Sequence, residues 1–126
     1  MKSILFFLFA ALLLGGCGGT PANATYQQIT QAEAKEMMDT QEVIVLDVRE
    51  QSEYASGHIP GAVLLPVGTI SEETASEVIP DKAATVLVYC RSGNRSKTAA
   101  AKLAELGYTA IYEFGGITTW PYATER

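Results

Sequence analysis

The 126 residues are enough for one domain and too few for two. Acidic residues outnumber basic ones by 14 to 9, and the net charge of −5 argues against a nucleic-acid-binding protein, because such proteins present basic surfaces to phosphates. No cluster of histidine, cysteine and carboxylate residues has the spacing of a metal site, and no motif requires a cofactor, so we expect neither.

The first residues of the chain are typical of an export signal. A basic residue is followed by an uncharged apolar run at 4–14, which is short for a membrane span of about 20 residues. The string LGGC, which ends at Cys17, resembles the lipobox of bacterial lipoproteins, in which the cysteine is acylated and becomes the new N-terminus. We therefore expect a signal peptide at 1–16, a lipid on Cys17 and a small, polar tether at 17–25. The protein would then be exported and anchored to a membrane by that lipid; an ordinary signal peptide or an uncleaved anchor with an incidental cysteine remains the alternative.

Apolar stretches alternate with helical patterns over 26–126 and predict one α/β domain with a parallel sheet. The predicted strands lie near 28–29, 43–48, 62–65, 85–89 and 108–113, and the predicted helices near 30–38, 50–55, 72–78 and 96–106. Thr30 and Glu33 have the spacing of a capping box, and Gly107 is placed to end the last helix. The inner strands are apolar on both faces, as strands covered on both sides are. Ligands bind beyond the carboxyl ends of such strands, and Cys90 directly follows one of them.

The segment after that strand reads YCRSGNRS at 89–96 and contains no proline, so its amides are free to point inward. Gly93 can adopt positive φ at no steric cost, and Asn94 tolerates it better than most residues. Inward amides at a helix N-terminus form an anion-binding nest, to which Arg91 and Arg95 add positive charge. We expect the following residues to bind a substrate anion: Arg91, Ser92, Gly93, Asn94, Arg95 and Ser96.

The nest would act on Cys90. A free thiol has a pKa of about 8.5, and amide donors, a helix dipole and arginines all favour the thiolate. A thiolate can attack the outer sulfur of thiosulfate or of a persulfide, and the same amides could hold the resulting Cys–S–S⁻ group. If Cys17 carries a lipid, Cys90 has no disulfide partner in the chain; it is then either a working thiol or a buried structural cysteine. The first interpretation requires inward amides and an accessible Cys90 side chain.

Four separated motifs together resemble the rhodanese domain over nearly all of residues 26–122. They are LDVRE at 46–50, EYASGHIPGA at 53–62, YCRSGNRS at 89–96, and Gly115-Gly116 followed by Trp120. The resemblance implies a rhodanese-like three-layer fold, with a five-stranded parallel sheet flanked by helices, and a catalytic cysteine, matched by Cys90, that becomes persulfidated. Asp47 and Arg49 match the family's DxR pair, which we interpret as structural support that braces the active-site loop or the neighbouring turns.

Related phosphatases and arsenate reductases use a Cys-x₅-Arg loop around a tetrahedral anion, whereas four residues separate Cys90 from Arg95 here. A tighter ring suits a single sulfur atom, which favours sulfur transfer over phosphate or arsenate chemistry. A carrier module that presents persulfidated Cys90 to a partner protein without turnover remains the second hypothesis. The expected partners are a small sulfur-donor anion and a thiol, cyanide or protein acceptor, and nothing in the sequence requires more than a monomer. We expect His58 to satisfy backbone groups in a turn, and Trp120 to pack in the core or at its rim.

Overall fold

The computed structural model describes residues 25–126. The expected signal peptide at 1–16, the lipid-bearing Cys17 and nearly all of the expected tether lie outside the described residues. Within residues 25–126, no helix combines the length and the apolar character that crossing a membrane requires.

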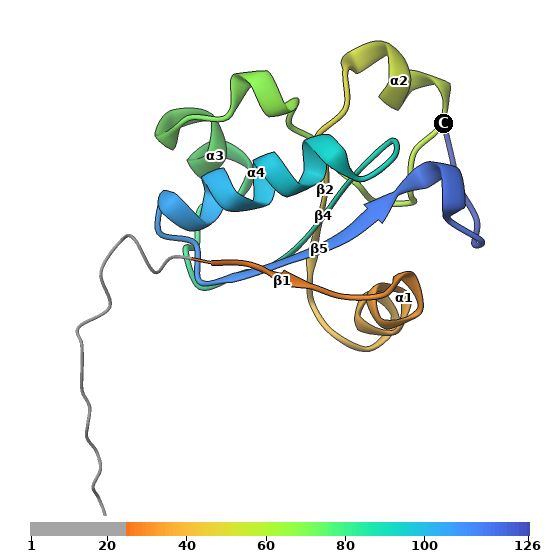
Figure 1. Cartoon of the computed structure of the whole chain (residues 1–126), viewed down its shortest axis with the longest axis horizontal. Coiled ribbons are helices and arrows are strands. Elements are labelled where there is room, and N and C mark those ends of the chain that lie inside the picture. Colours follow the sequence, from red (N-terminus) through yellow and green to blue (C-terminus); the bar gives the residue numbers. More distant parts are fainter. Residues whose placement is uncertain (1–24) are drawn as a thin grey trace, which may run out of the picture.

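Five parallel strands form one sheet in the order β1-β5-β4-β2-β3, so the predicted five-stranded parallel sheet is confirmed (Figure 1). The strands are β1 (Gln27–Gln28), β2 (Ile44–Asp47), β3 (Val63–Leu64), β4 (Thr85–Cys90) and β5 (Ala110–Gly116). The long central strand β4 is buried between β2 and β5, which explains why its residues are apolar on both faces. Its carboxyl end is Cys90.

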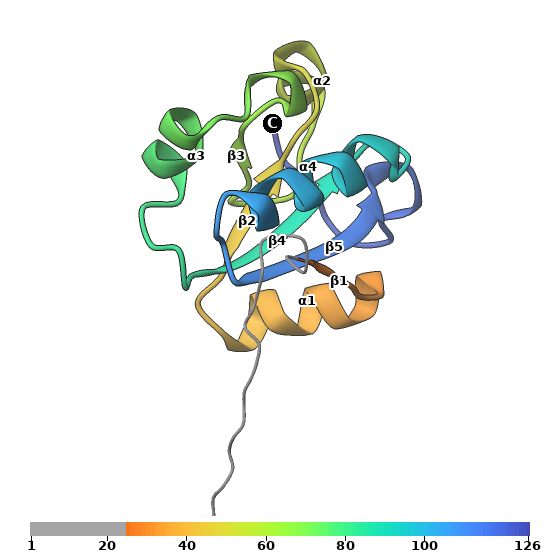
Figure 2. The ribbon, with the colours of Figure 1, turned by 60° about the vertical axis from the view of Figure 1, so that its left-hand side comes forward.

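Helices cover both faces of the sheet and give three layers (Figure 2). The helices are α1 (Gln31–Thr40), α2 (Gln51–Ser56), α3 (Glu72–Val78) and α4 (Asn94–Glu105), with two short 3₁₀ turns at Val67–Thr69 and Ile117–Thr119. Alternate residues of β4 belong to different cores: Val88 and Cys90 pack with α3 and α4, whereas Leu87 and Tyr89 pack with α1. The side chain of Cys90 therefore faces the layer that contains α4.

The ends of the helices follow from local sequence. Thr30 and Glu33 form the predicted capping box at the start of α1, and Gly107, with φ of 103°, follows α4 as predicted. Helix α4 begins at Asn94, two residues before the predicted start, because Gly93 with φ of 107° completes the turn after only three residues. Strand β5 continues through Gly116. The sequence indicated a loop at Gly115 and Gly116, because glycine is disfavoured in strands unless a close contact requires it.

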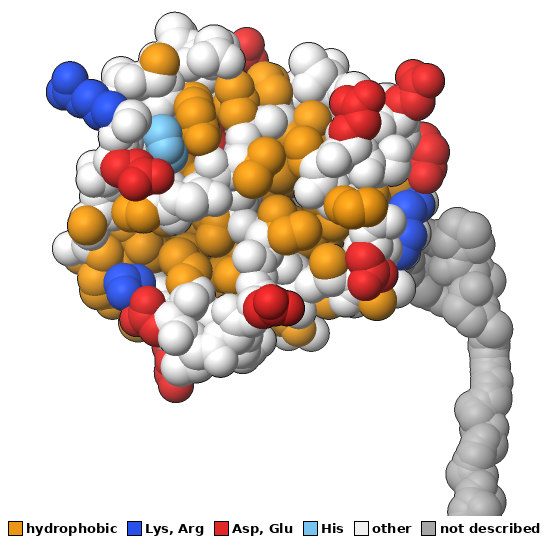
Figure 3. Space-filling view, turned by 180° about the vertical axis from the view of Figure 1, so that it is seen from behind, with side chains coloured by type: hydrophobic (Ala, Val, Ile, Leu, Met, Phe, Trp, Pro, Cys, Tyr) orange, Lys and Arg blue, Asp and Glu red, His pale blue; other side chains and the backbone are white. Residues whose placement is uncertain are grey.

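The two aromatic residues near the C-terminus lie in different surroundings. Trp120 is buried in the core beneath α1 and packs against Phe114 with ring centroids 5.5 Å apart, as predicted, whereas Tyr122 is 38 % exposed. Both line a shallow hollow together with Met38, Ile59 and Pro60. Apolar side chains occupy much of the centre of the face seen in Figure 3, and charged side chains lie mostly toward its rim.

Candidate active site

Cys90 is the last residue of β4, at the carboxyl edge of the sheet where parallel α/β folds bind ligands. Three residues, 91–93, connect it to α4, and the first turn of α4 faces back toward the strand end. Because the turn is so short, the helix N-terminus lies directly beside the sulfur. The predicted juxtaposition of a cysteine, a tight turn and a helix start is present.

Hydrogen-bond donors surround the sulfur of Cys90. The amide of Gly93 donates to Sγ at 3.0 Å, and the positive φ of Gly93 lets the chain turn from the loop into α4. Burial by itself raises the pKa of the Cys90 thiol, but the hydrogen bond with the Ser96 side chain and those from the amides of Ser96, Gly93 and Ser92 outweigh it and lower the pKa below its ordinary value. We call this group of donors, the amides of Ser92, Gly93 and Ser96, the collar.

The expectation of an accessible thiol is wrong for this structure. Cys90 retains only 1 % of its exposed surface, whereas Ser92 and Asn94 of the same segment are exposed. The burial has a local cause, since Sγ lies inside the collar and faces the core layer of α4. The atoms that donate to the sulfur thus also cover it.

The basic side chains near the loop have different roles. Arg91 is exposed. Arg95, expected to face the substrate, instead forms a two-pronged ion pair with Glu53 of α2 at 2.8 and 3.0 Å, so its guanidinium is committed to another helix. This pairing lowers the pKa of Glu53 from 4.5 to about 2, chiefly through the Arg95 hydrogen bonds. Lys97 donates to the carbonyl of Gly93 at 3.1 Å and thereby braces the turn.

Asp47 and Arg49 lie in a buried network beneath the site. Their carboxylate and guanidinium are 2.7 Å apart, and Arg49 also donates to the carbonyl of Gly57 at 2.7 Å. The hydroxyl of Tyr89, the residue before Cys90, donates to Asp47 at 2.6 Å and accepts from the amide of Ile59 at 3.0 Å. Burial and the Asp47 hydrogen bond raise the pKa of Tyr89, so this hydroxyl stays a donor. The pair therefore ties the end of β2 to the α2–β3 turn and to the end of β4.

Gly116 explains the glycine pair of the fourth motif. It lies opposite Cys90 in the sheet register, and a β-carbon there would overlap the backbone of Arg91 and Ser92. The carbonyl of Arg91 also accepts from the amide and the hydroxyl of Thr118, at 3.2 and 3.1 Å. The end of β5 is thus a support on which the loop rests.

Sequence reasoning missed Glu113, a carboxylate that is only 2 % exposed. One of its oxygens accepts from Gln28 at 3.2 Å; the other accepts from the Ser96 hydroxyl at 2.5 Å and from the amide of Gly115 at 2.9 Å. A signal was available, because strand alternation from Ile111 places an acidic residue at a core position. Ser96 connects it to the site, since its oxygen lies 3.4 Å from Sγ of Cys90.

Two other candidate features lie apart from this chemistry. Nδ1 of His58 lies 3.0 Å from the carbonyl oxygen of Tyr54, and the imidazole ring stacks on the Tyr54 ring with centroids 3.8 Å apart. His58 lies in the turn in which we expected it to satisfy backbone groups. Among residues 25–126, no three side chains of the histidine, cysteine and carboxylate types gather as metal ligands would.

The family model of the rhodanese-like domain matches residues 30–122. The chain is 35 % identical over 96 residues to thiosulfate sulfurtransferase GlpE of Coxiella burnetii, an alignment that covers 75 % of this chain and 87 % of that protein. It is 39 % identical over 88 residues to a sulfurtransferase of Allochromatium vinosum, covering 69 % and 79 % of the two chains. A solved structure described as a rhodanese with anions, from E. coli, superposes with a TM-score of 0.63 at 32 % identity and covers 68 % of this chain and 99 % of that one.

The chain belongs to the rhodanese-like family. It is a rhodanese-type sulfurtransferase, and the four motifs that suggested the family all lie around the carboxyl edge of its sheet or support that edge.

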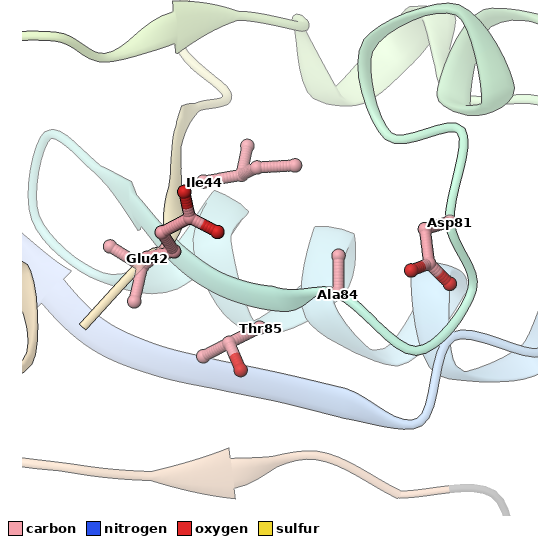
Figure 4. Close-up of a pocket in the computed structure, with 6 residues that line it drawn as sticks. Glu42, Ile44, Asp81, Ala84 and Thr85 are labelled. Atoms are coloured by element: carbon pink, nitrogen blue, oxygen red, sulfur yellow. The ribbon is translucent and has the colours of Figure 1, made fainter.

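The rhodanese domain has another hollow at the opposite edge of its sheet (Figure 4). It is lined by Glu42, Ile44, Asp81 and Ala84 among others, and by Thr85 at the amino end of β4. Five steps along a strand separate Thr85 from Cys90, about 16 Å at 3.3 Å per residue. This hollow is therefore remote from the sulfur and takes no part in its chemistry.

Proposed function

We propose that the protein transfers sulfane sulfur from a small anionic donor such as thiosulfate, and that Cys90 carries this sulfur as a persulfide. The observation on which the proposal depends is the collar of donors around Sγ, with the amide of Gly93 at 3.0 Å and the pKa of the thiol lowered despite burial. Donors that stabilise a thiolate stabilise the negative charge of a Cys–S–S⁻ group in the same way.

The reaction has two displacements. The Cys90 thiolate attacks the outer sulfur of thiosulfate, a new S–S bond forms, and sulfite leaves with the electron pair of the old one. An acceptor thiolate or cyanide then attacks the outer sulfur of the persulfide and takes it away, and the Cys90 thiolate is the leaving group. Each step exchanges one bond to sulfur for another and requires no external oxidant or reductant.

The charge around the loop supports an anionic donor. Three of the nine basic residues lie within 91–97, and no acidic residue occurs between Cys90 and Glu105 in a chain that is acidic as a whole. With Arg95 paired to Glu53, exposed Arg91 is the residue placed to attract a donor from solvent. The four-residue spacing from Cys90 to Arg95 further supports a ring that holds a single sulfur atom over one that holds phosphate or arsenate.

Burial of the sulfur adds a requirement to this proposal. Because Cys90 is 1 % exposed, we propose that the loop around it opens when a donor binds. The same burial favours the second function, a persulfide carrier that releases sulfur only to a protein able to open the loop. In that case the persulfide would be long-lived and turnover with small acceptors negligible.

Mass spectrometry of the full chain after incubation with thiosulfate tests the proposal. We expect one added sulfur atom on Cys90, none in Cys90→Ser, and an unchanged result in the control variant Cys17→Ser. Cyanide should then remove the sulfur and release thiocyanate; a persulfide that resists cyanide but passes to a partner protein would favour the carrier. If Cys90 gains no sulfur from thiosulfate, polysulfide or a protein persulfide, the proposal is wrong.

We also propose that a lipid on Cys17 holds the domain at a membrane surface outside the cytoplasm. The support is the short apolar run at 4–14 and the LGGC string. The net charge of −5 adds to it, because an acidic surface is repelled by anionic headgroups and cannot itself provide attachment. Protein from membrane fractions should carry an acyl mass on Cys17, and Cys17→Ser should leave the membrane; a membrane-bound Cys17→Ser protein would refute the anchor.

A further inference from the structure

We propose that Glu113 is the proton acceptor for Cys90 and acts through the hydroxyl of Ser96. This inference rests on the proposed role of Cys90 as the atom that receives sulfur. The three residues lie on three different elements, β4, α4 and β5, and all are buried, with exposures of 1, 0 and 2 %.

The hydrogen bonds have a defined direction. The Ser96 hydroxyl has one proton and donates it to Glu113 at 2.5 Å; its other acceptor, the carbonyl of Gly115, is 3.4 Å away. The Ser96 oxygen is therefore left as an acceptor toward Cys90, and the thiol donates to it at 3.4 Å. The chain of donors runs from S–H to hydroxyl to carboxylate.

This order limits how the thiolate can form. When the S–H bond breaks, its proton forms a new O–H bond at Ser96, while the original Ser96 proton moves to Oε2 of Glu113. The products are a thiolate and a carboxylic acid. The acid now donates to Ser96, and Ser96 donates to the thiolate, so every hydrogen bond is kept with its direction reversed.

The transfer leaves the charge of the site unchanged. One negative charge exists before it, on Glu113, and one exists after it, on Cys90. Without the transfer, ionising the thiol would place two anions on a single buried hydrogen-bonded chain, which strongly disfavours the second ionisation. The proton remains on Glu113 through both displacements and returns to Cys90 when the thiolate is regenerated.

The surrounding groups offer no other proton acceptor in the described part of the chain. The Glu113 carboxylate accepts only from neutral partners: Gln28 from β1, Ser96 from α4 and the Gly115 amide on β5. The charged groups nearest the loop are Arg91, Lys97 and the ion pair Arg95–Glu53, in which both carboxylate oxygens are occupied. None of these forms a hydrogen bond with the sulfur.

The test measures thiolate formation, which needs no sulfur donor and no access of a reagent to the buried sulfur. Ultraviolet absorbance of the Cys90 thiolate in the full chain is followed against pH, with Cys90→Ser as the blank. The same samples are followed by infrared spectroscopy, because the transfer predicts that the thiolate and a protonated carboxyl group form together. An infrared band of a protonated carboxyl group should accompany the thiolate in the natural sequence and be absent from Glu113→Gln.

A carboxylate that merely sits beside the sulfur stays ionised when the thiolate forms. Thiolate absorbance in the natural sequence without the protonated-carboxyl band therefore overturns the proposal. Glu105→Gln, which removes an exposed carboxylate from α4, is the charge-matched control and should keep both signals.

Variants at Ser96 carry the test if Glu113→Gln does not fold. Ser96→Ala interrupts the chain, so the thiolate should form without the protonated-carboxyl band, whereas Ser96→Thr keeps a hydroxyl and should keep the two signals together. A carboxyl band that accompanies the thiolate in Ser96→Ala, or its absence in Ser96→Thr, would refute the relay. Because sulfur loading is measured separately, loss of the relay with intact loading leaves the proposed function standing, and the converse result leaves the relay standing.

Discussion

Replacing Arg49 by methionine tests the buried support of the active site most directly. Methionine keeps much of the side-chain volume and removes the guanidinium. Asp47, which is fully buried, then loses its three contacts with that group, at 2.7, 3.0 and 3.1 Å, and keeps only the Tyr89 hydroxyl at 2.6 Å and the Arg49 amide at 2.9 Å. The carbonyl of Gly57 also loses its donor.

The expected loss in the free energy of unfolding follows from these lost contacts. Removing one partner of a buried ion pair costs about 3–5 kcal/mol, because the remaining charge is left without compensation. Two donors stay on the Asp47 carboxylate, which favours the lower end, and the unpaired Gly57 carbonyl adds about 1 kcal/mol. We therefore expect Arg49→Met to lower the free energy of unfolding by about 4 kcal/mol, a large part of the 5–15 kcal/mol typical of a domain.

Urea unfolding, followed by the fluorescence of the single tryptophan, Trp120, measures this change. The transition midpoint should fall while the slope is kept. The double variant Asp47→Asn with Arg49→Met should recover at least about 1 kcal/mol, because it removes the unpaired charge. Lys35→Met, which breaks an exposed pair with Asp39, should change stability by less than about 0.5 kcal/mol. A loss under about 1 kcal/mol in Arg49→Met, or a double variant no more stable than the single one, would refute the reasoning.

Three further predictions concern the surroundings of the loop. Tyr89→Phe leaves the buried amide of Ile59 without its acceptor, and should destabilise the fold by about 1–3 kcal/mol in the same urea assay; no change would mean that water replaces the hydroxyl. Gly116→Ala places a β-carbon in the backbone of Arg91, and should both slow the loading of sulfur on Cys90 and lower the free energy of unfolding. Loading at the normal rate would show that the loop does not rest on this strand. The Glu53 pKa is depressed from 4.5 to about 2, so the ion pair with Arg95 contributes its full stabilisation of the fold above pH 4.5 and loses it as the pH falls toward 2. The stability of Glu53→Gln should not depend on pH in this way. Identical acid-unfolding curves for the two proteins would contradict the prediction.

Much of the fold could be predicted because its signals are local. Strand β4 is identified by a continuous apolar run, and the start of α1 by the reciprocal hydrogen bonds of Thr30 and Glu33, three residues apart. The positive φ of Gly93 was equally predictable, because it depends on the turn that contains it. The errors in these elements were confined to their ends, where Asn94 begins α4 early and Gly116 extends β5.

The sequence by itself thus determined the elements and the cysteine at the strand end, since each depends on periodicity or on neighbours within a few residues. Its four separated motifs indicated the family by resemblance. Only the tertiary structure decided what surrounds that cysteine. Arg95 meets Glu53 from 42 residues away, and Ser96 meets Glu113 from 17 residues away. Such contacts depend on which strands lie side by side in the order β1-β5-β4-β2-β3 and on how closely the layers pack. The burial of Cys90 has the same origin, because the cover over a side chain is supplied by the whole packed loop and its neighbours and by no single residue.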